Sequence, residues 1–523
     1  MLIPRSNSRL RRRPLGGYRY VRLRWRLLFT GIDFVGSLVF GMVRALRAVA
    51  VPGFVGKLVH LLLPGWRALA KRGHVRGKHG DASDAMPPER RVFRQGLVAT
   101  GRPPGTTKSF DDPRTILLIQ LDHLGDAILS TGMFPALRKR YPKASIEVLA
   151  GPAGRELFEA VAEVDRVHVC RVNRFGRASR LGWIASMLWW GCRLRSPRVD
   201  LGIDVRGEFP HAVILWLSGA RRRLGWNCGG GGFLLTDSPR FVVDRPEVES
   251  RMALLAELDI HPEAADEVLR PVFRPSDESR RRVAARLAQS CPRGGGRMTR
   301  GLSRFSRREN GTVPLSNPDG PRIVMHVGAG TPAKQWPLEY WRELVGWLVV
   351  RLNARVVLVG SSEDGEIARA LLERQPCPGV LDWTGRLGLE ELAAVLEEAD
   401  LFVGADSGPA HLAAAVGTPA VVLFSGTNSP RQWQPCGENV CVLWHPVECS
   451  PCHRRRCPWR DHPCMLGLTP GPVAEAVEEA CRGVACGESV ERMRRTPRVP
   501  VAACPPLPTQ GQASCCWHPS SQD

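Results

Sequence analysis

The feature that most constrains the fold is an alternation, present twice along the chain, of short β-branched or aliphatic runs with longer amphipathic patterns. Strands separated by helices form parallel sheets with helices on both faces. A chain of 523 residues is also too long for one compact core. We therefore predict an α/β protein in which two domains, each with a parallel sheet, face a cleft, with the ligand at the carboxyl ends of the strands.

The expected elements follow from the length and period of each pattern. In the first domain we predict strands at 115–120, 146–149 and 201–205, with an amphipathic helix at 127–140. In the second domain we predict strands at 323–327, 356–359, 401–403 and 420–424, with helices at 338–352 and 409–416.

Composition divides the chain into five regions. Residues 1–112 are a basic extension and linker, and residues 113–290 are the first Rossmann-like domain. Residues 291–320, with six Arg and six Gly, are a flexible linker. Residues 321–485 are the second Rossmann-like domain, and the proline-rich residues 486–523 form a disordered tail.

The basic charge is concentrated in the N-terminal extension. The net charge is +22, and residues 1–80 hold seventeen Lys and Arg against one acid, Asp33. The domains therefore lack the basic stripe of a nucleic-acid-binding module. The apolar run Leu27–Val43 has Asp33 inside it, and such a charge costs about 2.5 to 3.5 kcal/mol in a spanning helix. The pattern favours a helix lying on an anionic membrane; the alternatives are a spanning helix and an extension packed on its own protein.

The first motif, Ile116–Asp126, runs a buried strand into a turn at Gly125 and places Asp126 at the start of a helix. An aspartate there can be a structural N-cap. The same position faces the expected cleft, where a carboxylate can act as a general base.

The second motif, His326–Pro337, follows the first strand of the second domain. Its small residues allow close approach of a ligand to the backbone, and Lys334 brings a positive charge just before a helix. A diphosphate fits this arrangement, although the glycine spacing is not that of a Walker loop. The alternative is that Lys334 is a solvated lysine at a helix start.

The third motif, Asp400–Pro419, is the most informative. A strand ends near Gly404, residues 406–408 form a turn, and Pro409 opens a helix that carries His411. Backbone N–H groups at the helix start, with Ser407 beside them, predict an anion site that needs no metal. His411 can also be an ordinary core histidine.

These three stretches, in this order and spacing, resemble glycosyltransferase family 9, the heptosyltransferases of lipopolysaccharide core assembly, across roughly residues 114–480. Gly125–Asp126, Lys334–Pro337 and Asp406–Leu412 are similar to the motifs of the family. The segments Asp204–Gly207 and Leu224–Leu235 resemble its first-domain strand end and its glycine-rich loop. The resemblance implies the two-Rossmann GT-B fold.

The resemblance also implies roles for individual residues. Asp126 would be the catalytic base, and Arg206 would lie on the acceptor side. The donor nucleotide diphosphate and ribose would be bound by Lys334, Asp406, Ser407, Gly408 and His411.

The implied reaction is the inverting transfer of a heptose from a nucleotide sugar, usually ADP-heptose, to a lipopolysaccharide core or similar glycolipid acceptor. The partners would be this donor, the glycolipid and an anionic membrane surface, without nucleic acid, and the protein would be cytoplasmic and peripheral on the inner membrane of a bacterium. The alternatives are a different sugar or acceptor on the same fold, and a non-catalytic membrane-tethered binding protein.

The motifs indicate neither a cofactor nor a catalytic metal, because the chain has no Asp-x-Asp to hold a diphosphate through a divalent ion. One cysteine cluster is open to interpretation: Cys449, Cys452, Cys457 and Cys464. Its spacing matches no named metal motif, so plain thiols, a structural metal or cluster, and a disulfide all remain as alternatives.

Overall fold

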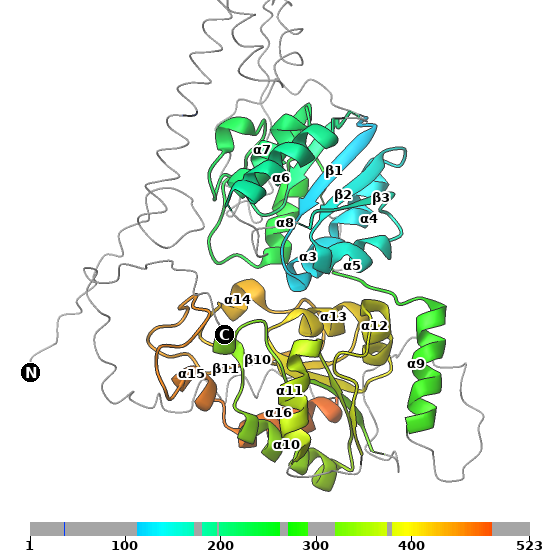
Figure 1. Cartoon of the computed structure of the whole chain (residues 1–523), viewed down its shortest axis with the longest axis vertical. Coiled ribbons are helices and arrows are strands. Elements are labelled where there is room, and N and C mark those ends of the chain that lie inside the picture. Colours follow the sequence, from blue (N-terminus) through cyan, green and yellow to red (C-terminus); the bar gives the residue numbers. More distant parts are fainter. Residues whose placement is uncertain are drawn as a thin grey trace, which may run out of the picture.

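The computed structural model describes Gly36 and residues 112–171, 180–195, 198–261, 270–290, 320–373 and 379–483. These residues form two α/β units, one above the other in Figure 1, each built on a parallel sheet. Except for Gly36, the predicted extension 1–112 lies outside the described residues up to Asp111, and so do most of the linker 291–320 and the tail beyond Gly483.

The first unit has a five-stranded parallel sheet of order β3-β2-β1-β4-β5. Its strands are β1 (Thr115–Gln120), β2 (Ser145–Ala150), β3 (Arg166–Val169), β4 (Leu201–Asp204) and β5 (Arg222–Gly225). Its helices are α3 (Leu124–Thr131), α4 (Met133–Arg140), α5 (Arg155–Glu159), α6 (Arg180–Arg193), α7 (Phe209–Leu217) and α8 (Glu247–Ala256).

The second unit has a six-stranded parallel sheet of order β11-β10-β9-β6-β7-β8. Its strands are β6 (Arg322–His326), β7 (Arg355–Val359), β8 (Val380–Asp382), β9 (Leu401–Ala405), β10 (Ala420–Phe424) and β11 (Val440–Trp444). Its helices are α10 (Leu338–Leu352), α11 (Gly365–Glu373), α12 (Leu389–Glu397), α13 (Gly408–Val416), α14 (Pro430–Trp433), α15 (Pro463–Leu466) and α16 (Pro470–Cys481).

Both sheets are buried on their two faces, as parallel sheets require. All six residues of β1 are buried, and so are all five of β9 and of β10. One apolar cluster runs from the first unit into the second, joining Ile128 and Phe158 to Leu396 and Ala413. The two units therefore pack directly on each other, through α3 against α13 and α5 against α12.

The predicted helix 127–140 is two helices, α3 and α4, that meet at Gly132. Pro135 explains the break, because it has no N–H to donate to the carbonyl oxygen of Thr131, four residues earlier. Strands β3, β5, β8 and β11, all at or near a sheet edge, were not predicted. β3, β5 and β8 are only three or four residues long, which is too short to show a period, whereas the apolar run of β11 was overlooked.

The helix α9 (Asp277–Ser290) falls inside the predicted first domain but packs on α12 of the second unit, beside it in Figure 1. Arg280 pairs with Glu397 at 2.7 Å, and the hydroxyl of Ser279 donates to Glu390 at 2.9 Å. Helix α9 therefore belongs by its contacts to the second unit. Among the described residues, no helix is long and apolar enough to cross a bilayer.

Candidate active site

Asp126 lies in the first turn of α3, directly after the central strand β1. Nη1 of Arg206 donates a hydrogen bond to its Oδ1 at 2.9 Å. Nε of the same guanidinium lies 2.8 Å from Oδ2 of Asp122, close enough for an ion pair although the N–H is not aligned for a hydrogen bond. Arg206 therefore bridges two carboxylates, one on each side of the turn at Gly125.

The loop after β4 holds Arg206 in place. Asp204, at the end of the strand, accepts hydrogen bonds from the backbone N–H of Arg206 at 3.0 Å and of Glu208 at 3.1 Å. Burial alone would lower the pKa of the Arg206 guanidinium, but the carboxylates of Asp122 and Asp126 raise it well above its usual range. The guanidinium is fixed and always charged, and it also lies 5.7 Å from the ring centre of Trp433 on the second unit.

Asp122 was not identified from the sequence. Burial raises the pKa of its carboxyl to about 6, against the opposing effect of Arg206. A signal was present, because Asp122 and Asp126 both follow a buried strand and are four residues apart. The sequence does not show that Asp122 and Asp126 both pair with Arg206, because that depends on where Arg206 lies in the fold.

A second buried ion pair continues the charge network. Nη1 of Arg251 lies 2.8 Å from Oε2 of Glu247, and both side chains are almost fully buried. Nη2 of Arg251 lies 4.0 Å from Oδ1 of Asp126. Gln432 of the second unit donates to Glu247 at 2.8 Å. The charges thus alternate in sign, so that each buried charge has a neighbour of opposite sign.

On the second unit, Lys334 and Asp406, both expected at the donor site, contact each other. Nζ of Lys334 lies 2.6 Å from Oδ2 of Asp406 and donates to its backbone carbonyl oxygen at 3.2 Å. Nδ2 of Asn428 donates to the same carboxylate oxygen at 3.0 Å. Asp406 therefore positions the lysine side chain, and this makes a solvated Lys334 a poor description of the structure.

The start of α13 offers fewer anion-binding groups than the sequence suggests. The amides of Ala410 and His411 donate to the carbonyl oxygen of Ser407, at 3.2 and 3.4 Å, and Pro409 has no N–H. The Ser407 hydroxyl donates to the carbonyl oxygen of Ala405 at 3.0 Å and lies 3.0 Å from Nδ1 of His326. Within the described residues, the amides of Ser407 and Gly408 are thus the donors of this turn that remain for a ligand.

His411 is buried at the contact between the two units. A Cβ on Gly125 would lie 2.8 Å from Cδ2 of its imidazole, so only glycine fits there without a shift. A Cβ on Gly408 would in turn lie 3.1 Å from the Leu124 side chain. Two glycines, one from each unit, thus allow the starts of α3 and α13 to approach closely.

Burial lowers the pKa of the His411 imidazole, which is therefore neutral at physiological pH. Its Nδ1 is buried and has no hydrogen-bond partner among the described residues. The hydroxyl of Thr331, three residues before Lys334, is buried and unpartnered in the same sense. Buried polar groups that the protein leaves unsatisfied are candidates for contacts with a ligand. Thr331 was missed from the sequence, where a threonine in a glycine-rich loop carries no special signal.

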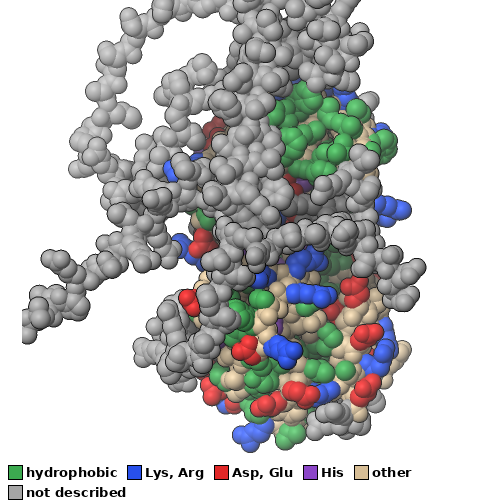
Figure 2. Space-filling view, turned by 60° about the vertical axis from the view of Figure 1, so that its left-hand side comes forward, with side chains coloured by type: hydrophobic (Ala, Val, Ile, Leu, Met, Phe, Trp, Pro, Cys, Tyr) green, Lys and Arg blue, Asp and Glu red, His purple; other side chains and the backbone are tan. Residues whose placement is uncertain are grey.

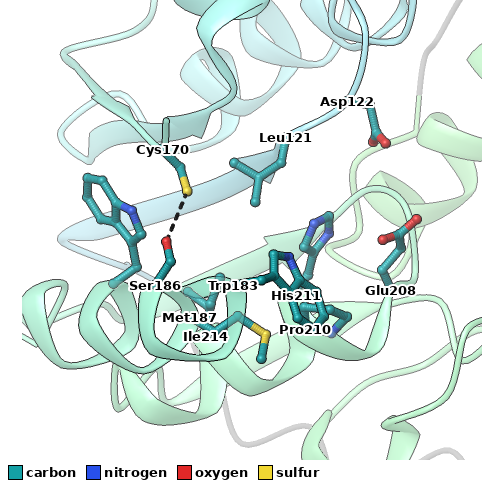
Figure 3. A pocket seen from close by; sticks show the side chains of 11 residues that line it. Leu121, Asp122, Cys170, Trp183, Ser186, Met187, Glu208, Pro210, His211 and Ile214 are labelled. Carbon is teal, nitrogen blue, oxygen red and sulfur yellow. Dashed lines mark hydrogen bonds between the residues drawn. The ribbon is translucent and has the colours of Figure 1, made fainter. Parts of the chain in front are cut away.

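A small pocket opens in the first unit, beside Asp122 (Figure 3). Helix α6 lines it with Trp183, Ser186 and Met187, and His211 of α7 faces them. The pocket combines aromatic and apolar walls with charged groups at one end.

The cysteine cluster lies in the loop between β11 and α16. Cys449, Cys452, Cys457 and Cys464 carry thiols in the structure, so the disulfide alternative is not seen. Burial raises the pKa of Cys464 to about 11, and the other three thiols add to the shift. Within the described part of the chain, no three His, Cys, Asp or Glu side chains are placed as metal ligands would be. The metal alternative stays a prediction.

Solved structures with the same arrangement are known. The ADP-heptose lipopolysaccharide heptosyltransferase II of Escherichia coli superposes with a TM-score of 0.52 at 23% identity, covering 70% of this chain and 98% of that one. A glycosyltransferase family 9 protein of Veillonella parvula gives 0.55 at 20% identity, covering 71% and 98%. The fold is therefore the GT-B fold, as predicted.

The sequence comparisons narrow the class to one family. The model of glycosyltransferase family 9 (heptosyltransferase) matches residues 189–462. A lipooligosaccharide heptosyltransferase 2 of Haemophilus influenzae is 26% identical, over 63% of this chain and 88% of its own length. A lipopolysaccharide heptosyltransferase 2 of Escherichia coli K12 is 25% identical, over 63% and 87%. The chain belongs to glycosyltransferase family 9 and is a glycosyltransferase.

Proposed function

We propose that the enzyme transfers a heptose from ADP-heptose to a lipopolysaccharide core or similar glycolipid acceptor, with inversion at the anomeric carbon. Relatives named for lipopolysaccharide heptosyl transfer support the sugar and the acceptor. A related Escherichia coli heptosyltransferase solved with ADP supports the nucleotide as a candidate. The observation that carries the proposal is the direct contact between the start of α3, with Asp126, and the start of α13, with His411.

In this mechanism Asp126 takes the proton from the acceptor hydroxyl as that oxygen attacks the anomeric carbon. Nη1 of Arg206 donates to Oδ1 of the carboxylate at 2.9 Å, which orients the group and leaves Oδ2 for the acceptor. Nη2 of Arg251 lies 4.0 Å from the same Oδ1 and adds positive charge there. A base on one face of the sugar and a diphosphate leaving from the other give inversion.

The second unit would bind the departing diphosphate. Lys334 supplies a positive charge that Asp406 holds in position, and the Gly408 amide supplies a donor at the start of α13. The unpartnered His411 Nδ1 and Thr331 hydroxyl are further polar groups for the nucleotide. Fixed donors of this kind stabilise the negative charge that develops as the glycosidic bond to the diphosphate breaks.

The test is a donor screen with the full chain, in which release of free nucleotide diphosphate from ADP-heptose, UDP-glucose and GDP-mannose is followed with a heptose-terminated acceptor. ADP-heptose should turn over best. Asp126→Asn should lower kcat by ~10² or more while ADP binding is kept, because a general base contributes about 10²- to 10⁴-fold. Asp277→Asn is the matched control, since the Asp277 side chain is 84% exposed on α9.

The outcomes separate the alternatives. Full activity in Asp126→Asn with loss of activity in Asp122→Asn would assign the base to Asp122 instead. Faster turnover of another nucleotide sugar would keep the fold and change the donor. Binding of ADP without turnover of any sugar would favour a non-catalytic binding protein.

We also propose, from the basic extension, that the enzyme works on the cytoplasmic face of a bacterial inner membrane. Seventeen Lys and Arg among residues 1–80 suit an anionic leaflet, where each cation near the surface adds about 1 kcal/mol. Whether Leu27–Val43 spans or lies on the bilayer is decided by alkaline carbonate extraction, which releases a surface helix and leaves a spanning one.

A further inference from the structure

Helix α6 carries a continuous apolar stripe on its outer side. Ile184, Leu188 and Trp189 are 43%, 49% and 56% exposed, and they are among the few large hydrophobic side chains of the described residues with this much exposure. With Ala185 and Cys192, also exposed, they recur at the i, i+4 spacing of one helix face. Figure 2 shows hydrophobic side chains gathered on this side of the first unit.

The inner side of α6 is fixed by packing, so the outer stripe cannot rotate inward. Met187 and Leu194 are buried in the core of the first unit. Gly191 lies so close to α7 that a Cβ there would be 2.4 Å from Cβ of Leu217. A helix anchored in this way holds its exposed stripe in one orientation.

The sequence that flanks the stripe is rich in arginine. From Cys170 to Val199 the sequence has seven Arg and no Asp or Glu. Within the described residues, Arg193 ends α6 and Arg198 follows it, and both are exposed. A helix with an apolar face, an exposed Trp and flanking arginines is typical of a segment that lies in the interface of an anionic membrane.

The charge also argues against two other occupants of this surface. The N-terminal extension has apolar runs, but its excess of +16 over residues 1–80 would be repelled by the arginines around α6. A second copy meeting the same face would bring the same arginines against each other. Anionic lipid headgroups have the complementary charge, and acyl chains accept the apolar stripe.

We infer that the outer face of α6 docks on the anionic bilayer that holds the acceptor. The inference rests on the proposed glycolipid acceptor and adds a contact surface to it. The inner face of the same helix lines the pocket beside Asp122 (Figure 3). Docking through α6 therefore brings the acceptor side of the site next to the membrane, where a lipid-anchored sugar is presented.

The test uses hydroxyl-radical footprinting of the full chain, with mass spectrometry reading the oxidation of Trp189. Vesicles of phosphatidylcholine with phosphatidylglycerol should protect Trp189, and vesicles of phosphatidylcholine alone should protect it less. The double variant Leu188→Glu, Trp189→Glu should bind the anionic vesicles at least about tenfold more weakly, because two large apolar side chains no longer enter the bilayer.

Val350→Glu is the matched control. Val350 is 80% exposed on α10 of the second unit, so it is an apolar helix residue away from the proposed surface. It should leave vesicle binding unchanged. Both changes lie at exposed positions, and unaltered thermal unfolding of the variants shows that any loss of binding is not a loss of fold.

Three results would overturn the inference. Equal oxidation of Trp189 with and without anionic vesicles would show that α6 does not touch the bilayer. Protection without vesicles that rises with protein concentration would identify a second copy as the occupant. Protection without vesicles that is lost on deleting residues 1–105 would identify the extension.

The same variants separate this inference from the proposed function. With a water-soluble, deacylated acceptor, the double variant should keep the wild-type KM, and with the acceptor in vesicles its KM should rise about tenfold. Absence of wild-type transfer to the soluble acceptor would refute the proposed function, and the footprint of Trp189 would still be measured on its own.

Discussion

The buried pair of His211 and Asp204 makes the first unit sensitive to alkaline pH. His211 lies in α7, and its Nδ1 is 2.9 Å from Oδ1 of Asp204. Burial alone would lower the pKa of the imidazole, but the Asp204 carboxylate raises it from 6.5 to about 9. The folded protein therefore keeps His211 protonated at neutral pH. Asp204 pairs with this cation and also accepts a hydrogen bond from the backbone N–H of Arg206.

The size of the effect follows from proton linkage. Because the pKa is raised on folding, the pair stabilises the protein fully below the unfolded pKa, and this contribution is lost as pH rises through the folded one. With pKa values of 6.5 and about 9, the contribution is about 3 kcal/mol at low pH, slightly smaller near pH 7 and close to zero above about pH 10.

The decisive measurement is the titration of each histidine by deuterium exchange at the imidazole C2 position, read by mass spectrometry. His211 should titrate near pH 9, and His411 should titrate below its ordinary value because burial lowers its pKa. In urea unfolding, the stability difference between the wild type and His211→Gln should shrink by about 2 to 3 kcal/mol between pH 6 and pH 10. The direct titration takes precedence, since two domains need not unfold in one step.

A His211 pKa near 6.5 would refute this reasoning, because it would mean that Asp204 does not hold a charged partner. If the free energies of unfolding of the wild type and His211→Gln differed by the same amount at every pH, the stability argument would also be refuted. Activity supplies a further check: it should fall above about pH 9 in the wild type, as the loop that positions Arg206 loses its anchor.

Three other changes test the site. Lys334→Ala should weaken ADP binding by ~1.5 to 3 kcal/mol in calorimetric titration, as loss of a charge-assisted hydrogen bond does. Lys143→Ala, on an exposed turn, is the control and should leave the affinity unchanged. Equal ADP affinity of the wild type and Lys334→Ala would show that Lys334 does not bind the donor. Gly125→Ala should lower kcat by about tenfold or more, because the new Cβ meets His411 at 2.8 Å and displaces Asp126. Gly365→Ala, where nothing lies within 4 Å of the added Cβ, is its control, and unchanged kcat in both would show that the close approach is dispensable. Activity should persist in the presence of a chelator, since the proposed phosphate site uses Lys334 and a helix start. An immediate requirement for Mg²⁺ would contradict this site. Slow inactivation with release of metal would instead locate a structural ion at Cys449–Cys464.

The sequence by itself determined the architecture and the ends of the main strands. The central strands and helix α10 were predicted closely, because a buried strand or an amphipathic helix shows its period over five to fifteen neighbouring residues. The strand-end motifs followed from the same local logic, since the carboxyl ends of parallel strands share one edge of a sheet. Lys334 was singled out in this way, whereas Asp406 was assigned to the donor site by the resemblance to family 9.

Only the tertiary structure decided which charges meet. Arg206 reaches Asp126 across 80 residues of sequence, and Arg251 reaches it across 125. These pairings depend on the order of strands in the sheet and on where α8 packs, and no local period encodes either. The burial of His411 against Gly125 depends on how the two units dock, so sequence alone could not choose between a core histidine and a ligand-binding one. The apolar stripe of α6 was overlooked for the same reason: its period is visible in the sequence, but only packing shows which face remains exposed.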